Sequence, residues 1–250
     1  ITRTQPDLVS APGQTSRTFP VWFNLKAAPM NDVNVRRALS LATDRKACLD
    51  TVLGGSGKVG AMLPESQVGG YDGLSDLPYY QHDVEGAKKL LADAGHGDGI
   101  KATLKLPPPS YARRGGEIIA SQLRKVGIDL EIIPVEWGVW VPEVFKAKDY
   151  DLTIVSHTEP QDIGIYGRDD YYFNYKSDAF KKIMADLNAE TDTAKRYALM
   201  GEAQKTITND AVNVFLFQLA KAGVWNKKVN GLWENSPVQA NDLTGVSWAE

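Results

Sequence analysis

The sequence predicts an α/β fold in which a mixed, largely parallel sheet is flanked by helices. Two observations lead to this prediction. Strand-like and helix-like segments alternate in the middle of the chain, and several helix-like segments carry their apolar residues on one face. The chain has 250 residues, which is enough to bury a large core.

The N-terminal third is expected to contain two helices separated by a long loop. The first helix follows Asn31 or Asp32, either of which can cap it, and its apolar face continues until Gly54 ends it. Residues 55–82 are rich in glycine, proline and tyrosine and are expected to form a loop. Asp83 then caps the second helix.

The central part alternates between strands and helices. Strands are expected at 101–106, 128–135 and 150–156, with helices between them at 110–126 and 138–148. This order predicts parallel strands joined by right-handed crossovers. The rest of the chain is expected to form helices at 177–189 and 192–209, a strand at 211–219, and about thirty loop-rich residues.

Composition excludes several classes of protein. No apolar run approaches the roughly 20 residues that cross a bilayer. A net charge of −3 without a Lys/Arg block argues against a nucleic-acid partner. Cys48 is the single cysteine, so an internal disulfide and a multi-cysteine metal site are both excluded. We expect no cofactor.

One glycine-rich motif resembles a nucleotide-binding loop. Gly55, Gly57 and Gly60 have the spacing G-x-G-x-x-G, but a helix precedes them and no helical pattern follows. A dinucleotide site needs a strand before the motif and a helix after it. We therefore interpret the segment as a surface loop.

The segment "SHTEPQDIGIYGRDDY" (156–171) is the candidate site, because it follows the third central strand. Ligands of open α/β sheets bind beyond the carboxyl ends of the strands. This segment and the preceding helix combine polar groups with flat apolar faces, as a small-molecule cleft requires. The candidate ligand-binding residues are Trp137, His157, Thr158, Glu159, Asp162, Tyr166 and Tyr171.

Two other interpretations of this segment remain open. His157, Glu159 and Asp162 could hold a metal in a metal-assisted hydrolase, although their spacing matches no metalloenzyme signature. The carboxylates could also belong to a solvated acidic loop.

The run "FNLKAAPMNDVNVRRALSLATDRKACLDTVLGG" resembles the extracytoplasmic solute-binding proteins of peptide-type ABC importers. The matching positions are Phe23, Asn24, Pro29, Asp32, Val35, Arg36, Ala38, Leu39, Ala42, Asp44 and Arg45. Later segments, including "AKKLLADAG", "QLRKVGIDLEI" and "YDLTIVS", are similar and occur in the expected order, so the resemblance covers about residues 20–220.

The resemblance implies a periplasmic-binding-protein-like lobe of a receptor that is not an enzyme. Such proteins are periplasmic, close two lobes over a solute, and deliver it to a membrane permease. Residues 21–220 would form the C-terminal lobe, and 1–20 and 221–250 would lead to a missing first lobe, so we expect a fragment. Its uncovered surface could support dimerisation.

The resemblance also indicates how a solute would be held. In peptide binders of this family, an aspartate nine positions after the aspartate of the "YDL" strand pairs with the α-amino group. Here that position is Pro160, and His157 stands where tryptophan is usual. Glu159 or Asp162 is then expected to supply the anionic anchor, which predicts a peptide-like or amine-bearing solute.

Overall fold

The structure is a computed structural model of the chain. It describes residues 4–62, 76–157, 162–232 and 242–249, and for residues 11–17, 162 and 219–222 it describes only the backbone. The strands are β1 (Leu8–Phe23), β2 (Gly57–Val59), β3 (Ile100–Leu106), β4 (Ile128–Pro134), β5 (Leu152–Ile154), β6 (Asn213–Asn226), β7 (Val229–Asn230) and β8 (Ser247–Trp248). The helices are α1 (Val33–Ala42), α2 (Arg45–Leu53), α3 (Val84–Asp93), α4 (Ser110–Arg124), α5 (Trp137–Trp140), α6 (Asp178–Ala189) and α7 (Thr193–Asn209). A π-helix, η3 (Val141–Ala147), continues α5, and η4 (Asp162–Gly167) is a 3₁₀ helix.

The main sheet has six strands in the order β2-β6-β1-β5-β3-β4. The predicted parallel unit is confirmed, because β3 pairs in parallel with both β4 and β5. The other three pairings, β1 with β5, β1 with β6 and β2 with β6, are antiparallel. The sheet is therefore mixed, as expected, but not largely parallel, because three of its five pairings, all of which involve β1 or β6, are antiparallel.

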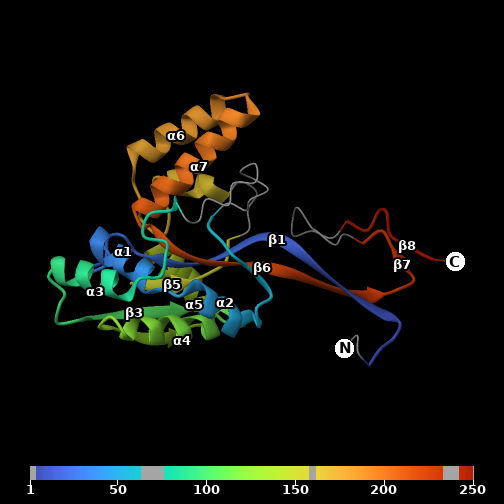
Figure 1. The fold of residues 1–250 in the computed structure, drawn as a ribbon, viewed down its shortest axis with the longest axis horizontal. Coiled ribbons are helices and arrows are strands. Elements are labelled where there is room, and N and C mark those ends of the chain that lie inside the picture. Colours follow the sequence, from blue (N-terminus) through green and yellow to red (C-terminus); the bar gives the residue numbers. More distant parts are fainter. Residues whose placement is uncertain (1–3, 63–75, 158–161, 233–241, 250) are drawn as a thin grey trace.

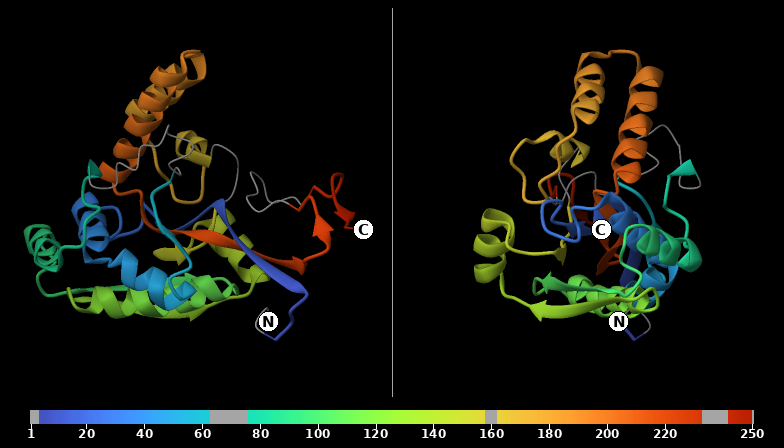
Figure 2. Two further views of the ribbon diagram at one scale, coloured as in Figure 1. Left: turned by 45° about the vertical axis from the view of Figure 1, so that its right-hand side comes forward. Right: turned by 90° about the vertical axis from the view of Figure 1, so that its left-hand side faces the viewer.

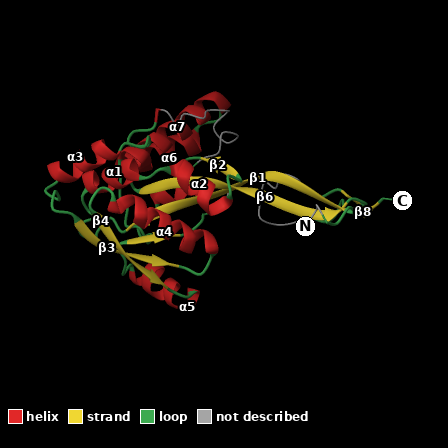
Figure 3. Cartoon of the chain, turned by 60° about the horizontal axis from the view of Figure 1, so that its bottom comes forward, coloured by secondary structure: helices red, strands yellow, loops and turns green. Residues whose placement is uncertain are grey.

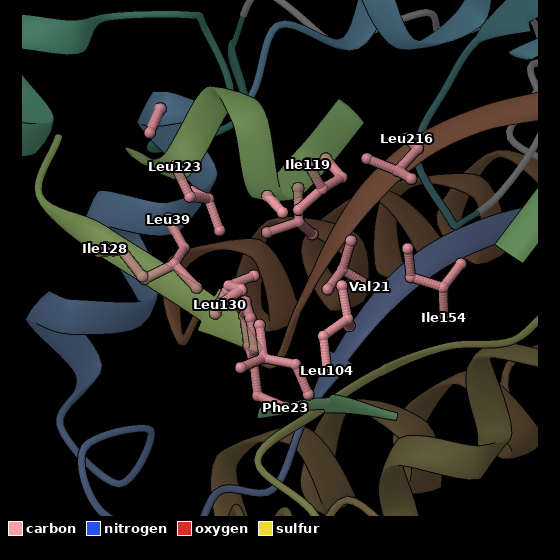
Figure 4. Packing of buried hydrophobic residues seen from close by; sticks show 14 of the residues in the cluster. Val21, Phe23, Leu39, Leu104, Ile119, Leu123, Ile128, Leu130, Ile154 and Leu216 are labelled. Carbon is pink, nitrogen blue, oxygen red and sulfur yellow. The ribbon is translucent and has the colours of Figure 1, made fainter. Parts of the chain in front are cut away.

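Helices cover both faces of the sheet. Helices α1 to α4 cover one face, and α6 and α7 lie side by side over the other (Figures 1 and 2). Side chains from β1, β3, β4 and α4 meet in the first of these layers (Figure 4). Gly116 of α4 lets the helix approach closely, because a Cβ atom there would lie 2.3 Å from Leu106 Cδ1.

Beyond the helix-covered body, β1 and β6 continue together as a two-stranded ribbon, and both chain ends lie at its far end (Figures 1 and 3). Their pairing extends from Leu8 opposite Asn226 to Trp22 opposite Asn213. The expected lobe boundaries at residues 20 and 220 therefore both fall inside strands.

Polar caps explain where several helices begin, and one of them corrects the predicted first helix. Asp32 caps α1, as expected, but that helix ends at Ala42. Asp44 starts α2 because its side chain accepts a hydrogen bond from the Ala47 amide. The continuous apolar face had concealed this break.

The glycine-rich segment also differs from its prediction. It does not follow a strand, so the dinucleotide interpretation stays excluded. Gly57–Val59, however, is strand β2 at one edge of the sheet and is not a loop. Its register sets Lys58 opposite Gln218 of β6.

Candidate functional site

The candidate site begins where β5 ends. Beyond β5, the His157 amide donates to the Thr18 carbonyl and the Thr18 amide donates to the His157 carbonyl, both at 3.2 Å. The Ser156 amide donates to Tyr111 Oη at 3.1 Å, and the Tyr111 ring packs edge-on against Phe19 with centroids 4.4 Å apart. These contacts fix the backbone that presents His157.

His157 lies on a layer of buried aromatic rings. Its ring centroid is 4.7 Å from that of Trp22, and it stacks on Tyr172 with 15° between the ring planes. His157 Nε2 is 3.1 Å from Tyr172 Oη. Trp22 and Tyr172 are buried and His157 is half-buried. One side of the imidazole is therefore supported by the core.

A partly exposed set of rings extends from His157 to the start of α5. Tyr171 packs edge-on against both His157 and Phe145, with centroids 6.3 and 5.7 Å away. The Phe145 ring stacks on the Trp140 ring. Trp140 in turn packs edge-on against Trp137, with ring centroids 5.4 Å apart. Phe145 is 39% exposed and Trp137 is 41% exposed. We call His157, Tyr171, Phe145 and Trp137 the aromatic surface.

Polar contacts hold this surface against the sheet. Trp140 Nε1 donates to Thr153 Oγ1 at 3.0 Å, and that hydroxyl donates to the Lys105 carbonyl at 2.7 Å. The Lys105 ammonium contacts Glu143 Oε2 at 3.0 Å and Asp149 Oδ2 at 3.2 Å. Burial by itself lowers the pKa of Lys105, but these hydrogen bonds outweigh it, so the pKa lies above its usual value.

The structure places three of the seven candidate residues on one connected series of rings: Tyr171 contacts His157 directly, and Trp137 is linked to it through Trp140 and Phe145. Tyr166 is buried among Trp22, Phe173 and Phe180, and its hydroxyl donates to Asn213 Oδ1 at 2.7 Å. It therefore belongs to the supporting core and does not line a surface. Thr158 and Glu159 lie outside the described residues, and for Asp162 only the backbone is described, at the start of η4.

Sequence reasoning missed Phe145 and Arg168. Trp137, Val141 and Phe145 recur every four residues and are all about 40% exposed, so their spacing could have identified a shared helical face. Arg168 lies over the Tyr171 ring with its guanidinium carbon 4.7 Å from the centroid. No sequence pattern indicated that cation–π contact.

The described rings suit noncovalent binding, whereas the metal interpretation depends on Glu159 and Asp162, whose side chains lie outside the described part of the chain. Within the described part of the chain, no group of three or more His, Cys, Asp or Glu residues could hold a metal ion. Flat, partly exposed rings next to hydrogen-bonding groups can instead desolvate and orient an organic solute. Among the described residues, no helix is long and apolar enough to cross a membrane.

Comparison with known proteins identifies a family. Residues 2–182 match the model of the bacterial extracellular solute-binding proteins, family 5, middle region. The oligopeptide-binding protein AppA of Bacillus subtilis is 28% identical over 220 residues, a match that spans 79% of this chain and 40% of that protein. The dipeptide-binding protein of Escherichia coli is 33% identical over 132 residues, spanning 51% of this chain and 24% of that protein.

Solved structures have the same fold. HbpA2 from Haemophilus parasuis superposes with a TM-score of 0.85 at 23% identity, over 100% of this chain and 51% of that one. Bacillus subtilis AppA in complex with a nonapeptide superposes with a TM-score of 0.83 at 21% identity, over 98% of this chain and 53% of that one. The chain thus spans about half the length of these structures.

Proposed function

This chain belongs to family 5 of the bacterial extracellular solute-binding proteins, and from that premise we propose that the full-length protein is the solute receptor of an ABC importer. It would act outside the cytoplasm, in the periplasm, and pass its solute to a membrane permease without catalysing a reaction. The relatives support this proposal, because several are named as oligopeptide- or dipeptide-binding proteins.

The aromatic surface is the observation that carries the proposal for this chain. It lies beyond the C-terminal end of β5, where neighbouring loops of an α/β sheet leave room for a ligand. Trp137, Phe145 and Tyr171 offer ring faces and edges, while His157 and the Arg168 guanidinium add polar groups beside them. We propose that these residues form one wall of the solute-binding cleft.

The opposite wall would come from a second lobe of the full-length protein. Large apolar side chains along and beyond the β1–β6 ribbon are exposed: Val9 (39%), Val224 (48%), Leu243 (62%) and Trp248 (68%). A two-stranded ribbon is only marginally stable by itself in water. In our proposal the second lobe covers these residues, and without it the same surface would favour dimerisation.

The proposed solute is peptide-like or otherwise carries an amine. Glu159 or Asp162 would supply a carboxylate to its ammonium group, and the aromatic surface would exclude water from that pair. A hydrogen bond between two charged groups in such a setting is about twice as strong as a neutral one.

Native mass spectrometry of the full-length protein, purified from its own host, tests the class of solute. A retained peptide or amine is the expected result, whereas a retained neutral sugar would contradict the carboxylate anchor. The variants Glu159→Gln and Asp162→Asn should identify the anchor, one of them weakening affinity for that solute at least tenfold. Glu131→Gln, which neutralises an exposed carboxylate on β4, is the matched control.

A further inference from the structure

A second concave site lies just beyond the C-terminal end of β1. It is a cavity of about 550 Å³ between the segment after β1, the start of α1, the residues before α6 and the end of α7. β1 runs from Thr18, opposite His157, to Phe23, just before this cavity, a length of about 17 Å. Figure 1 shows α1 at the end of the body away from both chain ends. The cavity therefore shares no lining residue with the aromatic surface, although the Asn174 amide at its edge donates to the Tyr171 carbonyl at 3.0 Å.

Four cationic side chains line this cavity: Lys26, Arg36, Arg37 and Lys176. Among the described residues, none of them forms an ion pair within 4.0 Å. Asp210 is the single carboxylate in the lining, and it accepts a 2.5 Å hydrogen bond from Tyr175 Oη. The lining thus carries a clear excess of positive charge.

The two arginines are held in place without being neutralised. Arg36 donates to the carbonyls of Met30, Asp210 and Ala211 at 2.8 to 2.9 Å. Burial lowers its pKa to about 10, which still leaves it charged at neutral pH. Three of the five guanidinium N–H groups make these bonds, and Arg36 is one of the residues that line the cavity.

Arg37 is fixed in a similar way. It donates to the Asn209 carbonyl at 2.9 Å, and its guanidinium carbon lies 4.5 Å from the centroid of the Tyr79 ring. Asn31 and Asn174 also line the cavity, and the Asn174 amide nitrogen is already used, because it donates to Asn24 Oδ1 at 2.8 Å. Fixed guanidinium groups beside amides and flexible ammonium groups are typical of phosphate recognition.

Other charged side chains near the cavity determine how much of its positive charge remains unbalanced. Asp32 influences Arg36 electrostatically, but its side chain already caps α1, so the helix N-terminus adds nothing to the site. Asp169 and Asp170 lie near Lys176, and they pair with Lys181 and Lys148 respectively. With Asp32 and Asp210 set against four cations, a divalent anion would balance the cavity.

We propose that this cavity binds the phosphate group of a phosphorylated organic compound, at a site whose lining residues differ from those of the aromatic surface. Its volume is typical of a small-molecule site and is much larger than a bare phosphate ion needs. The phosphate could belong to a soluble phosphate ester or to a phospholipid headgroup, since both present the same dianionic or monoanionic oxygens.

Titration calorimetry of the full-length protein with inorganic phosphate and with glycerol 3-phosphate tests the proposal. We expect saturable binding, tighter for the ester. The double variant Lys26→Glu/Lys176→Glu changes two exposed side chains and should weaken binding at least tenfold. Lys195→Glu is the control for each of the two single substitutions, because it makes the same charge change at the other end of α7, about 22 Å along the helix from Asp210.

Flotation with vesicles separates the two sources of phosphate. Binding to phosphatidylglycerol vesicles, but not to phosphatidylcholine vesicles, and its loss in the double variant would indicate a headgroup. Binding of glycerol 3-phosphate without vesicle binding would indicate a soluble ester. The proposal is overturned if neither probe binds, or if Lys195→Glu weakens binding as much as the double variant does. Failure here would leave solute binding at the aromatic surface unaffected.

Discussion

The two faces of the sheet are packed with different kinds of side chain. Under α1 to α4 the buried residues are mainly Val, Leu, Ile and Ala, whereas the face toward α5, η4, α6 and α7 is rich in Trp, Tyr and Phe. β1 serves both, because Val21 and Phe23 point into the first layer and Trp22 into the second. We call these layers the aliphatic core and the aromatic core.

The difference shows how the fold separates stability from binding. The side chains of the aliphatic core carry almost no hydrogen-bonding groups, so they can pack against one another without polar partners. Buried aromatic residues such as Trp22 and Trp140 must pair their ring N–H groups, and they do so with the Val155 carbonyl and the Thr153 hydroxyl. The aromatic core therefore continues into partly exposed rings with polar neighbours, and the candidate site forms there.

Truncating the aliphatic core should have the largest effect on stability. Leu104 is fully buried on β3, between Ile132 and Leu152 in register. Leu104→Ala should lower the free energy of unfolding by about 4 kcal/mol, since it removes buried contacts and leaves a cavity. Urea unfolding measures this effect. Val139→Ala, at a side chain that is 39% exposed, should change it by less than about 1 kcal/mol.

Solute affinity of the folded Leu104→Ala variant should match the wild type. A large loss of affinity would show that the two cores are not separable in function.

Removing the buried charge that joins the two cores should have the next largest effect. Arg45 of α2 donates to the carbonyls of Phe215 and Tyr80, which belong to the aromatic core, and its guanidinium carbon lies 4.0 Å from the Tyr80 centroid. Arg45→Met should cost about 3 kcal/mol of unfolding free energy, because buried carbonyl groups lose their donors.

Arg124→Met is the matched control, because this side chain is 66% exposed and makes only a 3.6 Å surface ion pair. An equal loss in both variants would contradict the role assigned to Arg45.

Alkaline pH should destabilise the aromatic core specifically. Burial raises the pKa of Tyr80 to about 12, although the nearby Arg45 opposes the shift, and burial also raises the pKa of Tyr150. The folded state therefore favours the neutral phenol. Its contribution is complete below pH 10 and is lost as the pH rises from 10 to 12, which amounts to about 3 kcal/mol for Tyr80.

Urea unfolding at a series of pH values from 8 to 12 measures this loss. All variants should carry Cys48→Ala, because burial raises the pKa of that thiol to about 12 and it would otherwise add its own pH dependence. Tyr80→Phe should be less stable at pH 8, since the hydrogen bond to the Gly60 carbonyl is lost, but its stability should fall less steeply above pH 10. An unchanged slope would contradict the assignment.

Changing the aromatic surface should have the smallest effect on stability and a clear effect on binding. Trp137→Ala should change the unfolding free energy by less than about 1 kcal/mol, because the ring is 41% exposed, and should weaken solute binding about tenfold. Tyr197→Ala, at a ring that is 37% exposed on α7, is the control. Calorimetry with the identified solute compares the affinities of the two variants. Equal affinities would show that Trp137 does not belong to the binding site.

Local sequence patterns determined most of the elements. The period-two strands, the caps at Asp32, Asp83 and Ser177, and the alternation from β3 to β5 were all predictable, because these features depend on residues close together in the chain. The same patterns located the candidate segment after β5 and identified Trp137, His157 and Tyr171 as candidate residues.

Contacts between distant residues decided the rest. β1 and β6 meet across some two hundred residues, so no local pattern could reveal that they pair with each other inside the sheet and make most of its pairings antiparallel. The packing of α5, α1 and α7 likewise decides three further features. These are the burial of Tyr166, the exposure of Phe145 and the grouping of four cations around the second cavity. A sequence specifies which face of each element is apolar. Only the packing of the whole chain decides which of these faces meet and which remain exposed.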